Sequence, residues 1–525
     1  MTVATAQVLG IGRGAPLDAT RPYIGLVGVL LGSTMAVLGN RVTTIGLADL
    51  RGALGIGFDE GAWITTAFGI GQLLSGISSP YFASLLGGRR VLLAGIAAFF
   101  AASLLAPLSP NLGAYLTVQF IGGFGSGTFI PLTIIFILRH LPRHLLITGL
   151  AIYAMNSEFS QNVAASLEGF YTEHWSWRWI AWQHCLLLPA MFACVLVGMP
   201  KDPPSSGTMG RLDGPGLAYA WLAFAALFTA LDQGNRLDWT RSGFVIALLV
   251  VGCLAFCAFV LRERTADRPV VNLRLLGRPS LLLLFVLLAG FRFIILSTAY
   301  IIPYYLQTIQ NFRGLEVGAV LLWIALPQVL LVLPLATLLK RVDPRWTLAT
   351  GSLLVGVACL MATGLTDTWQ TANFLLSQVL QAIGQSLALT SIVVLVATRI
   401  KPEEAVTLGA FIQTSRLFGG EVGVAFMQTF VRVREQVHSN LLGLHVEAQA
   451  GEVSGRLVAY GWALAPRHID PADTNEAALR LLGNAVARQA SVLAYIDGFA
   501  AAAFVALACV ALVALLPAAG RASPG

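Results

Sequence analysis

Long apolar segments recur along this chain and exclude most folds. We identify fourteen of them, each close to the ~20 residues that a helix needs to cross a bilayer. They cover residues 23–47, 63–86, 91–108, 112–138, 147–170, 178–199, 215–232, 243–261, 279–309, 317–339, 347–365, 374–397, 405–430 and 492–516. Charged residues make up only 11% of the chain, against about 25% in soluble domains. The sequence therefore predicts an all-α integral membrane protein with fourteen transmembrane helices.

Lysine and arginine in the loops predict how these helices are oriented. The loops on the side of the N-terminus contain nineteen of these residues, and the short loops on the opposite side contain five. Such an excess marks the cytoplasmic side of a membrane protein. We therefore expect both termini in the cytoplasm. The formal net charge of +7 reflects this topology and does not indicate a nucleic acid partner.

The chain repeats itself weakly at about half its length. The stretch "VQFIGGFGSG" (118–127) resembles "SQVLQAIGQS" (377–386), so that Gln119 corresponds to Gln378, 259 residues later. Internal repeats of this size build many secondary transporters. We expect two six-helix halves joined by two inserted central helices. The predicted parts are a cytoplasmic N-terminus (1–22), an N-terminal half (23–200), the inserted helix pair with its linkers (201–278), a C-terminal half (279–516) that includes an exterior loop (431–490), and a cytoplasmic tail (517–525).

Several short motifs resemble those of one transporter family. They are "WITTAFGIG" (63–71), "WSWRWIAW" (175–182), "LDQGNRLDWTRSG" (231–243), "IPYYLQ" (302–307), "TSRLFGG" (414–420) and "QASVLAYIDGF" (489–499). Together they resemble the fourteen-span drug:proton antiporters of the major facilitator superfamily, the EmrB/QacA type. The resemblance implies the major facilitator fold, no cofactor beyond the proton gradient, and a place in the inner membrane of a bacterium. It also implies a periplasmic adaptor protein and an outer-membrane channel as partners of the exterior loop.

The departures from the family pattern fall on its coupling residues. The acid of the first span is replaced by Gly39, and the arginine of the fourth span aligns with Gln119. The antiporter motif of the fifth span is reduced to "AASLEG" (164–169), and Ser84 stands where an aspartate is common in the loop after the second span. The resemblance therefore implies the fold but does not supply the proton-coupling residues.

Charged residues inside the predicted spans are the first candidates for substrate binding or coupling. Near mid-membrane we place Arg41, Glu158, Arg292, Arg416 and Glu421. Intramembrane ionisable residues usually face a cavity or pair with one another. Arg41 therefore either faces an aqueous cavity between the halves or forms a static pair with Glu158. Three positive and two negative charges leave an excess of one, which favours an anionic or amphiphilic acidic substrate.

Polar and aromatic residues in the same spans are candidates for completing a cavity. They are Asn40, Thr44, Gln119, Gln161, Tyr304, Gln307 and Gln381.

The sequence favours a secondary exporter of amphipathic compounds that works by alternating access, and it leaves two alternatives. One is a major facilitator importer or symporter of an organic anion. A polytopic membrane enzyme is more remote, because it would need a polar constellation at one membrane face and we find none. None of the three lysines lies in a phosphate-binding loop motif, so the sequence shows no sign that ATP drives the process. The exterior loop is expected to form one or two amphipathic helices, as a solvated cap or as a partner-binding surface.

Overall fold

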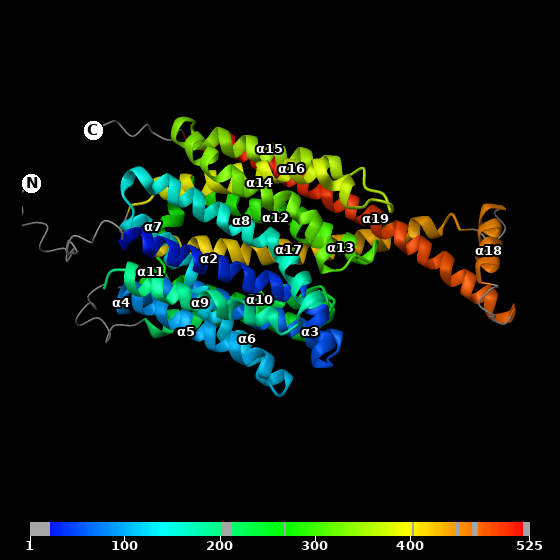
Figure 1. The fold of residues 1–525 in the computed structure, drawn as a ribbon, viewed down its shortest axis with the longest axis horizontal. Coiled ribbons are helices and arrows are strands. Elements are labelled where there is room, and N and C mark those ends of the chain that lie inside the picture. The colour runs from blue at the N-terminus through cyan, green and yellow to red at the C-terminus, as the bar shows by residue number, and fades with distance from the viewer. Residues whose placement is uncertain are drawn as a thin grey trace, which may run out of the picture.

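The computed structural model describes residues 21–201, 213–266, 269–401, 404–446, 451–464 and 471–517, and within these ranges it contains helices but no strand. The predicted N-terminal segment (1–22) and tail (517–525) therefore lie almost wholly outside the described residues. Figure 1 shows a bundle of long helices with an extension at one end. The first part of the bundle contains α2 (Arg21–Ile45), α3 (Leu47–Leu54), α4 (Phe58–Leu86), α5 (Gly88–Leu105), α6 (Leu112–Gly127), α7 (Phe129–His140), α8 (Arg143–His174) and α9 (Trp179–Gly198). The remainder contains α10 (Gly214–Gly234), α11 (Gly243–Thr265), α12 (Pro279–Ile294), α13 (Ile302–Thr308), α14 (Gly314–Arg341), α15 (Pro344–Ala362), α16 (Thr371–Thr398), α17 (Ala405–Gly443), α18 (Gly451–Leu464) and α19 (Pro471–Ala514).

Each of the fourteen predicted spans is occupied by helix. Within the described residues, eleven helical stretches are long and apolar enough to cross a membrane. The other three predicted spans are α4, α8 and α17, which are long helices with more polar residues. Two spans are interrupted. One divides into α6 and α7 at Thr128, and the other passes from α12 through a π-helical segment, Ser297–Ile301, into α13.

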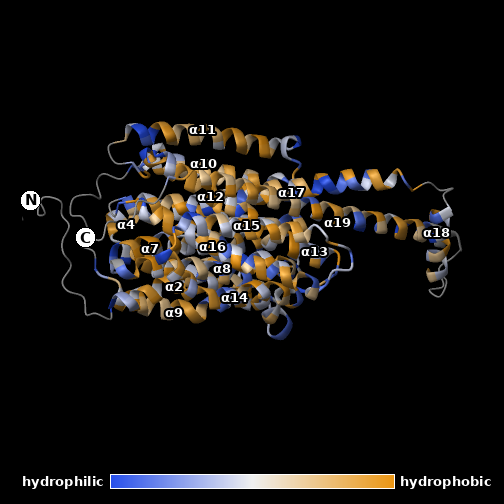
Figure 2. Cartoon of the chain, turned by 90° about the horizontal axis from the view of Figure 1, so that it is seen from above, coloured by the Kyte–Doolittle hydropathy of each residue, from blue (hydrophilic) through white to orange (hydrophobic). Residues whose placement is uncertain are grey.

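The outer surface of the bundle is apolar, as a bilayer requires. Leu254, Leu330 and Phe504 expose 66%, 78% and 74% of their surface. Exposing these side chains to water would cost free energy. In the hydrocarbon core of a bilayer they are favourable, because that core offers no hydrogen bonds to polar groups. Hydrophobic residues accordingly run along the helices of the bundle in Figure 2.

The helices pack into two groups. The N-terminal bundle is formed by α2–α9, in which α2 packs on α8 and α9, and α6 packs on α4 and α5. The C-terminal bundle is formed by α12–α17 and α19, in which α15 packs on α16 and α19, and α17 packs on α12 and α19. The two bundles meet where α8 packs on α14 and where α4 packs on α17.

The inserted helices lie beside one of these junctions. Helix α10 packs on α11, on α4 of the N-terminal bundle and on α17 of the C-terminal bundle. The rings of Phe224 and Phe418 meet edge-on at 5.5 Å, and Phe228 covers Gly69 of α4. Helix α11 lies outside α10, and Figure 2 shows both along one edge of the molecule. The inserted pair therefore contacts both bundles at once.

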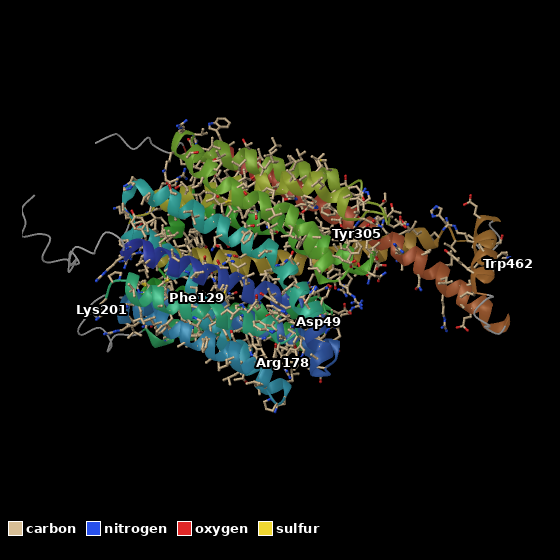
Figure 3. The ribbon with its side chains drawn as sticks, in the orientation of Figure 1. Asp49, Phe129, Arg178, Lys201, Tyr305 and Trp462 are labelled. Atoms are coloured by element: carbon tan, nitrogen blue, oxygen red, sulfur yellow. The ribbon has the colours of Figure 1, made fainter. Side chains whose placement is uncertain are left out.

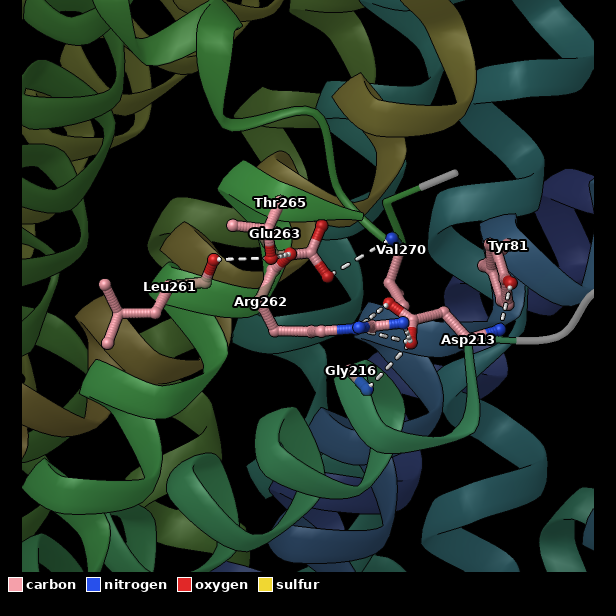
Figure 4. Close-up of polar contacts among 8 residues, drawn as sticks. All are labelled: Tyr81, Asp213, Gly216, Leu261, Arg262, Glu263, Thr265 and Val270. Atoms are coloured by element: carbon pink, nitrogen blue, oxygen red, sulfur yellow. Dashed lines mark hydrogen bonds and ion pairs between the residues drawn. The ribbon is translucent and has the colours of Figure 1, made fainter. Parts of the chain in front are cut away.

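Polar contacts fix the inserted pair at the end where α10 begins and α11 ends (Figure 4). Arg262 pairs with Asp213 at 2.9 Å, and the amide of Asp213 donates to the hydroxyl of Tyr81 on α4 at 3.0 Å. The carboxylate of Glu263 accepts hydrogen bonds from the amides of Val270 and Val271 at 3.2 and 3.0 Å. These contacts tie α10, α11 and the following linker to α4.

Helices α17 and α19 run far beyond the bundle. The predicted spans 405–430 and 492–516 are parts of helices of 39 and 44 residues, or about 58 and 66 Å at 1.5 Å per residue, against ~30 Å of hydrocarbon. Arg434 and His438 of α17 bind Asp497 of α19 at 2.6 and 2.7 Å. The predicted exterior loop is therefore largely helical, with α18 at its tip. Figure 3 places Trp462 on this tip and Lys201 at the opposite end of the molecule.

Candidate functional site

Two of the five predicted intramembrane charges form an ion pair across the junction of the bundles. Glu158 of α8 is buried, with 1% of its side chain exposed, and Nη1 of Arg292 on α12 lies 4.0 Å from its Oε1. The same Nη1 donates to Oε1 of Gln161 at 3.4 Å. Residues three and four apart share a helix face, so Gln161 and Asn162 accompany Glu158. Asn162 donates to Gln328 of α14 at 3.2 Å, which adds a second contact between the bundles.

Arg41 crosses the junction by a different route. Its Nη2 donates to the carbonyl of Ala299 at 3.0 Å, and Ala299 lies within the π-helical segment Ser297–Ile301. A π-helical turn breaks the regular pairing of backbone groups and is frequent at functional sites. Arg41 therefore contacts a backbone carbonyl of the C-terminal bundle. The ion-pair partner of Glu158 is Arg292 and not Arg41, so the predicted static pair of Arg41 with Glu158 is wrong.

Arg416 and Glu421 both lie on α17 but have different partners. Arg416 interacts electrostatically with Tyr153 and Glu158, and Arg292 interacts with Arg416, Glu158 and Arg41. We call Arg41, Glu158, Arg292 and Arg416 the junction cluster. Glu421 interacts instead with Asp232 of α10.

Asp232 is a half-buried acid of α10 that the sequence analysis missed. Its carboxylate accepts hydrogen bonds from the hydroxyl of Thr66 on α4 and from Gln233, and it interacts with Glu421 on α17. We assigned it to the motif "LDQGNRLDWTRSG" and not to the intramembrane charges, because the predicted span ends at residue 232. Asp232 is the one carboxylate within the seventh apolar segment, 215–232. Selecting every charged residue inside a predicted span, as was done for the five intramembrane charges, would have found it.

The junction cluster contains polar atoms without partners. Among the described residues, no hydrogen bond is formed by either carboxylate oxygen of Glu158, by Nε of Arg41 and Arg292, or by Nη1 of Arg416. Buried polar groups are almost always hydrogen-bonded to protein or to ordered water. These atoms are therefore available to water, to a proton on the carboxylate, or to a ligand.

The predicted cavity residues are dispersed over several networks, and only Gln161 contacts the junction cluster. Gln381 donates to the hydroxyl of Ser297 at 3.1 Å, so it supports the π-helical segment. Asn40 donates to Gln72 at 3.4 Å, and the hydroxyl of Thr44 donates to the carbonyl of Asn40 at 2.8 Å. Tyr304 and Gln307 are exposed, and the ring of Tyr304 lies 5.0 Å from that of Tyr300.

Gln119 lies in a separate place, inside the N-terminal bundle. It donates to the hydroxyl of Tyr115 at 3.0 Å and lines a small cavity with Gly39, Thr43, Ser103 and His184. The space open to the centre of a water molecule is about 20 Å³, which is enough for one water. This cavity lies at the two positions, Gly39 and Gln119, where the family carries its acid and its arginine.

Comparison with known proteins identifies the family. The sequence profile of the Major Facilitator Superfamily matches residues 29–302 and 284–433. The multidrug export protein EmrB of Escherichia coli (strain K12) is 22% identical over 434 residues, which cover 81% of this chain and 83% of that protein. The fatty acid resistance protein FarB of Neisseria gonorrhoeae is 22% identical over 412 residues, which cover 78% of this chain and 81% of that protein.

A solved structure has the same fold. The proton:xylose symporter XylE, 12% identical, superposes with a TM-score of 0.54 over 95% of this chain and 97% of its own. At this identity the likeness concerns the fold alone. These relatives are transporters and not enzymes. The described part of this chain likewise contains eleven helical stretches long and apolar enough to cross a membrane, as expected for a membrane transporter. This chain therefore belongs to the Major Facilitator Superfamily of membrane transporters.

Proposed function

We propose that this protein is a secondary active exporter that moves amphipathic compounds outward in exchange for protons. The observation that carries the proposal is the junction cluster, whose contacts Arg292–Glu158 and Arg41–Ala299 join the two bundles within the membrane. Alternating access requires the bundles to move relative to each other around such a site. A proton or a substrate that changes these contacts would therefore change which side is open. The outward direction is inferred from the similarity to EmrB, a multidrug export protein.

Glu158 is the proposed proton carrier. It is the one carboxylate of the junction cluster, it is buried, and neither of its oxygens has a hydrogen-bond donor among the described residues. A proton that binds there would weaken the attraction of Arg292 and release one contact between the bundles. We expect Glu158→Gln to abolish proton-linked transport.

The test uses purified protein in vesicles with a pH-sensitive dye inside. The matched control is Glu173→Gln, because Glu173 lies on the same helix but is exposed. Loss of proton flux in Glu158→Gln, with the control unchanged and with normal thermal unfolding of both, would support the proposal. Proton flux at the wild-type rate in Glu158→Gln would contradict it.

A symporter of an organic anion is the second candidate, and one observation favours it. Because Arg292 is the ion-pair partner of Glu158, a proton on Glu158 frees that arginine for a substrate anion. Proton and anion would then bind together, as symport requires. The direction of proton flow during substrate efflux separates the two functions: protons enter while substrate leaves in antiport, and protons leave with the substrate in symport.

For the cell, we propose a multi-pass inner membrane protein with both termini in the cytoplasm and no cofactor. We also propose that the two bundles correspond to the N-terminal and C-terminal halves of the sequence, with α10 and α11 as the insert. In this orientation the extension formed by α17, α18 and α19 stands outside the membrane. It would then be the part that meets a periplasmic adaptor protein and, through it, an outer-membrane channel.

A further inference from the structure

We infer that the junction cluster binds the head group of an amphipathic organic anion, a carboxylate on an apolar skeleton. The inference names the substrate class of the proposed transporter and rests on transport in either direction. It starts from the charge balance. Glu421 interacts with Asp232 on α10, whereas Glu158, the single carboxylate of the cluster, interacts with Arg292 and Arg416, and Arg292 in turn interacts with Arg41. The excess of positive charge in the cluster is therefore two, and it becomes three when Glu158 is protonated.

An uncompensated excess of charge is costly inside a membrane. Buried charges in proteins are normally paired, because neither the protein interior nor lipid replaces the lost hydration. The other ionisable group against the cluster is Tyr153, whose neutral phenol brings no negative charge. Glu421 of α17 interacts with Asp232 of α10, whose carboxylate accepts hydrogen bonds from Thr66 and Gln233. An anion from outside the protein would balance the arginines.

The unpartnered donors of the cluster fit such an anion. One N–H direction on each arginine, Nε of Arg41, Nε of Arg292 and Nη1 of Arg416, has no acceptor among the described residues. The three arginines come from α2, α12 and α17, so these donors belong to both bundles. Guanidinium groups bind carboxylates through parallel, charge-assisted hydrogen bonds. Aromatic rings are available for the apolar part of the anion. Tyr300 directly follows Ala299, the residue that Arg41 contacts, and its ring packs against that of Tyr304.

Binding can be tested without transport, by calorimetry on the full chain in nanodiscs of phosphatidylcholine, a lipid without net charge. The probes are 4-phenylbutyrate, the cation 4-phenylbutyltrimethylammonium, which has a similar skeleton, and chloride. We expect saturable binding of 4-phenylbutyrate and none of the cation. Arg416→Gln should weaken this binding roughly ten- to hundred-fold. Arg416→Lys keeps the positive charge but lacks the two parallel donors of a guanidinium, so it should recover part of the binding.

The control is Arg434→Gln on the same helix, because Arg434 pairs with Asp497 of α19 and not with a member of the junction cluster. Equal binding of the cation, or binding of chloride without binding of 4-phenylbutyrate, would overturn the inference even in the wild-type protein. Glu158→Gln separates it from the proposed function. This variant should bind 4-phenylbutyrate at least as tightly as the wild type, because Arg292 loses its competing carboxylate, although it no longer couples transport to protons.

Discussion

Two glycines determine how closely α8 and α14 approach each other. A Cβ at Gly169 would lie 2.1 Å from the backbone nitrogen of Leu315, and a Cβ at Gly318 would lie 2.6 Å from the backbone of Ser166. Gly169 ends "AASLEG", the reduced form of the antiporter motif. The motif therefore keeps a structural role here, as the surface along which the two bundles close.

We expect Gly169→Ala to separate these helices locally. Overpacking of this kind costs about 1–3 kcal/mol, so the midpoint of thermal unfolding should fall and the amide of Leu315 should exchange faster with solvent. The matched control is Gly483→Ala in α19, where a Cβ meets nothing within 4 Å, and alanine there should be neutral or slightly stabilising. If both variants unfold at the same temperature, then α8 and α14 can separate at Gly169 without loss of stability, and the expectation is contradicted.

Glu404 forms a two-pronged ion pair outside the membrane-spanning helices. Arg278 donates to its two oxygens at 2.6 and 3.0 Å, which connects the start of α12 to the start of α17. The hydrogen bond from Arg278 holds the pKa of Glu404 below its ordinary value. A carboxylate with a lowered folded-state pKa stabilises the fold above its unfolded pKa, and this contribution is lost as the pH falls through the lowered value.

Glu404→Gln should therefore destabilise the protein at neutral pH and not at strongly acidic pH. The pair is partly exposed, so the effect should stay below about 1 kcal/mol. Thermal unfolding of the variant and the wild type across a pH series measures it. A difference that persists unchanged below the lowered pKa would show that the carboxylate contributes through packing and not through its charge.

At the level of helices, the inserted pair depends on a buried carboxylate. Asp213 is almost fully buried, and its partner Arg262 is 42% exposed. Arg262→Ala leaves that carboxylate with the amide of Gly216 as its remaining donor in the contacts described, so we expect a loss of about 1–3 kcal/mol. Adding Asp213→Ala should restore part of it. The exposed pair Arg480–Glu476 is the control, and Arg480→Ala should have no measurable effect on thermal unfolding.

The helices themselves were predictable because hydropathy is a local property. Each of the fourteen apolar segments is occupied by helix, whereas the short helices α3 and α18 lie almost wholly outside these segments. The continuation of α17 and α19 past residues 430 and before 492 was not predictable in this way. Their outer parts are polar, and a polar helix held by a contact such as Arg434–Asp497 leaves no mark in a hydropathy pattern.

The partners of the charges could not be read from the sequence. The choice of Arg292 over Arg41 for Glu158 depends on how the two bundles meet. The separation of Glu421 from the junction cluster depends on α10, which packs on both α4 and α17 and carries Asp232, the partner of Glu421. Both are properties of helix packing, and neighbouring residues along the chain carry no signal for them.

At the level of the whole molecule, the tip of the extension exposes large apolar side chains. Leu444, Val458 and Trp462 are 74%, 59% and 76% exposed. If a periplasmic adaptor protein binds there, Val458→Ser with Trp462→Ser should reduce export from whole cells. Transport by the same purified variant in vesicles should be unchanged, because the tip lies far from the junction cluster. Wild-type export from cells would make the extension a solvated cap.

Helix α17 is one continuous rod that carries Arg416 inside the bundle and ends at Gly443 near the tip. The 27 residues between them span about 40 Å, so a tilt of about 10° at the level of Arg416 would displace the far end by roughly 7 Å. The rod thus works as a lever that amplifies a small movement at the arginine. A protein holding its far end could sense, as a mechanical displacement, whether the site in the membrane is filled.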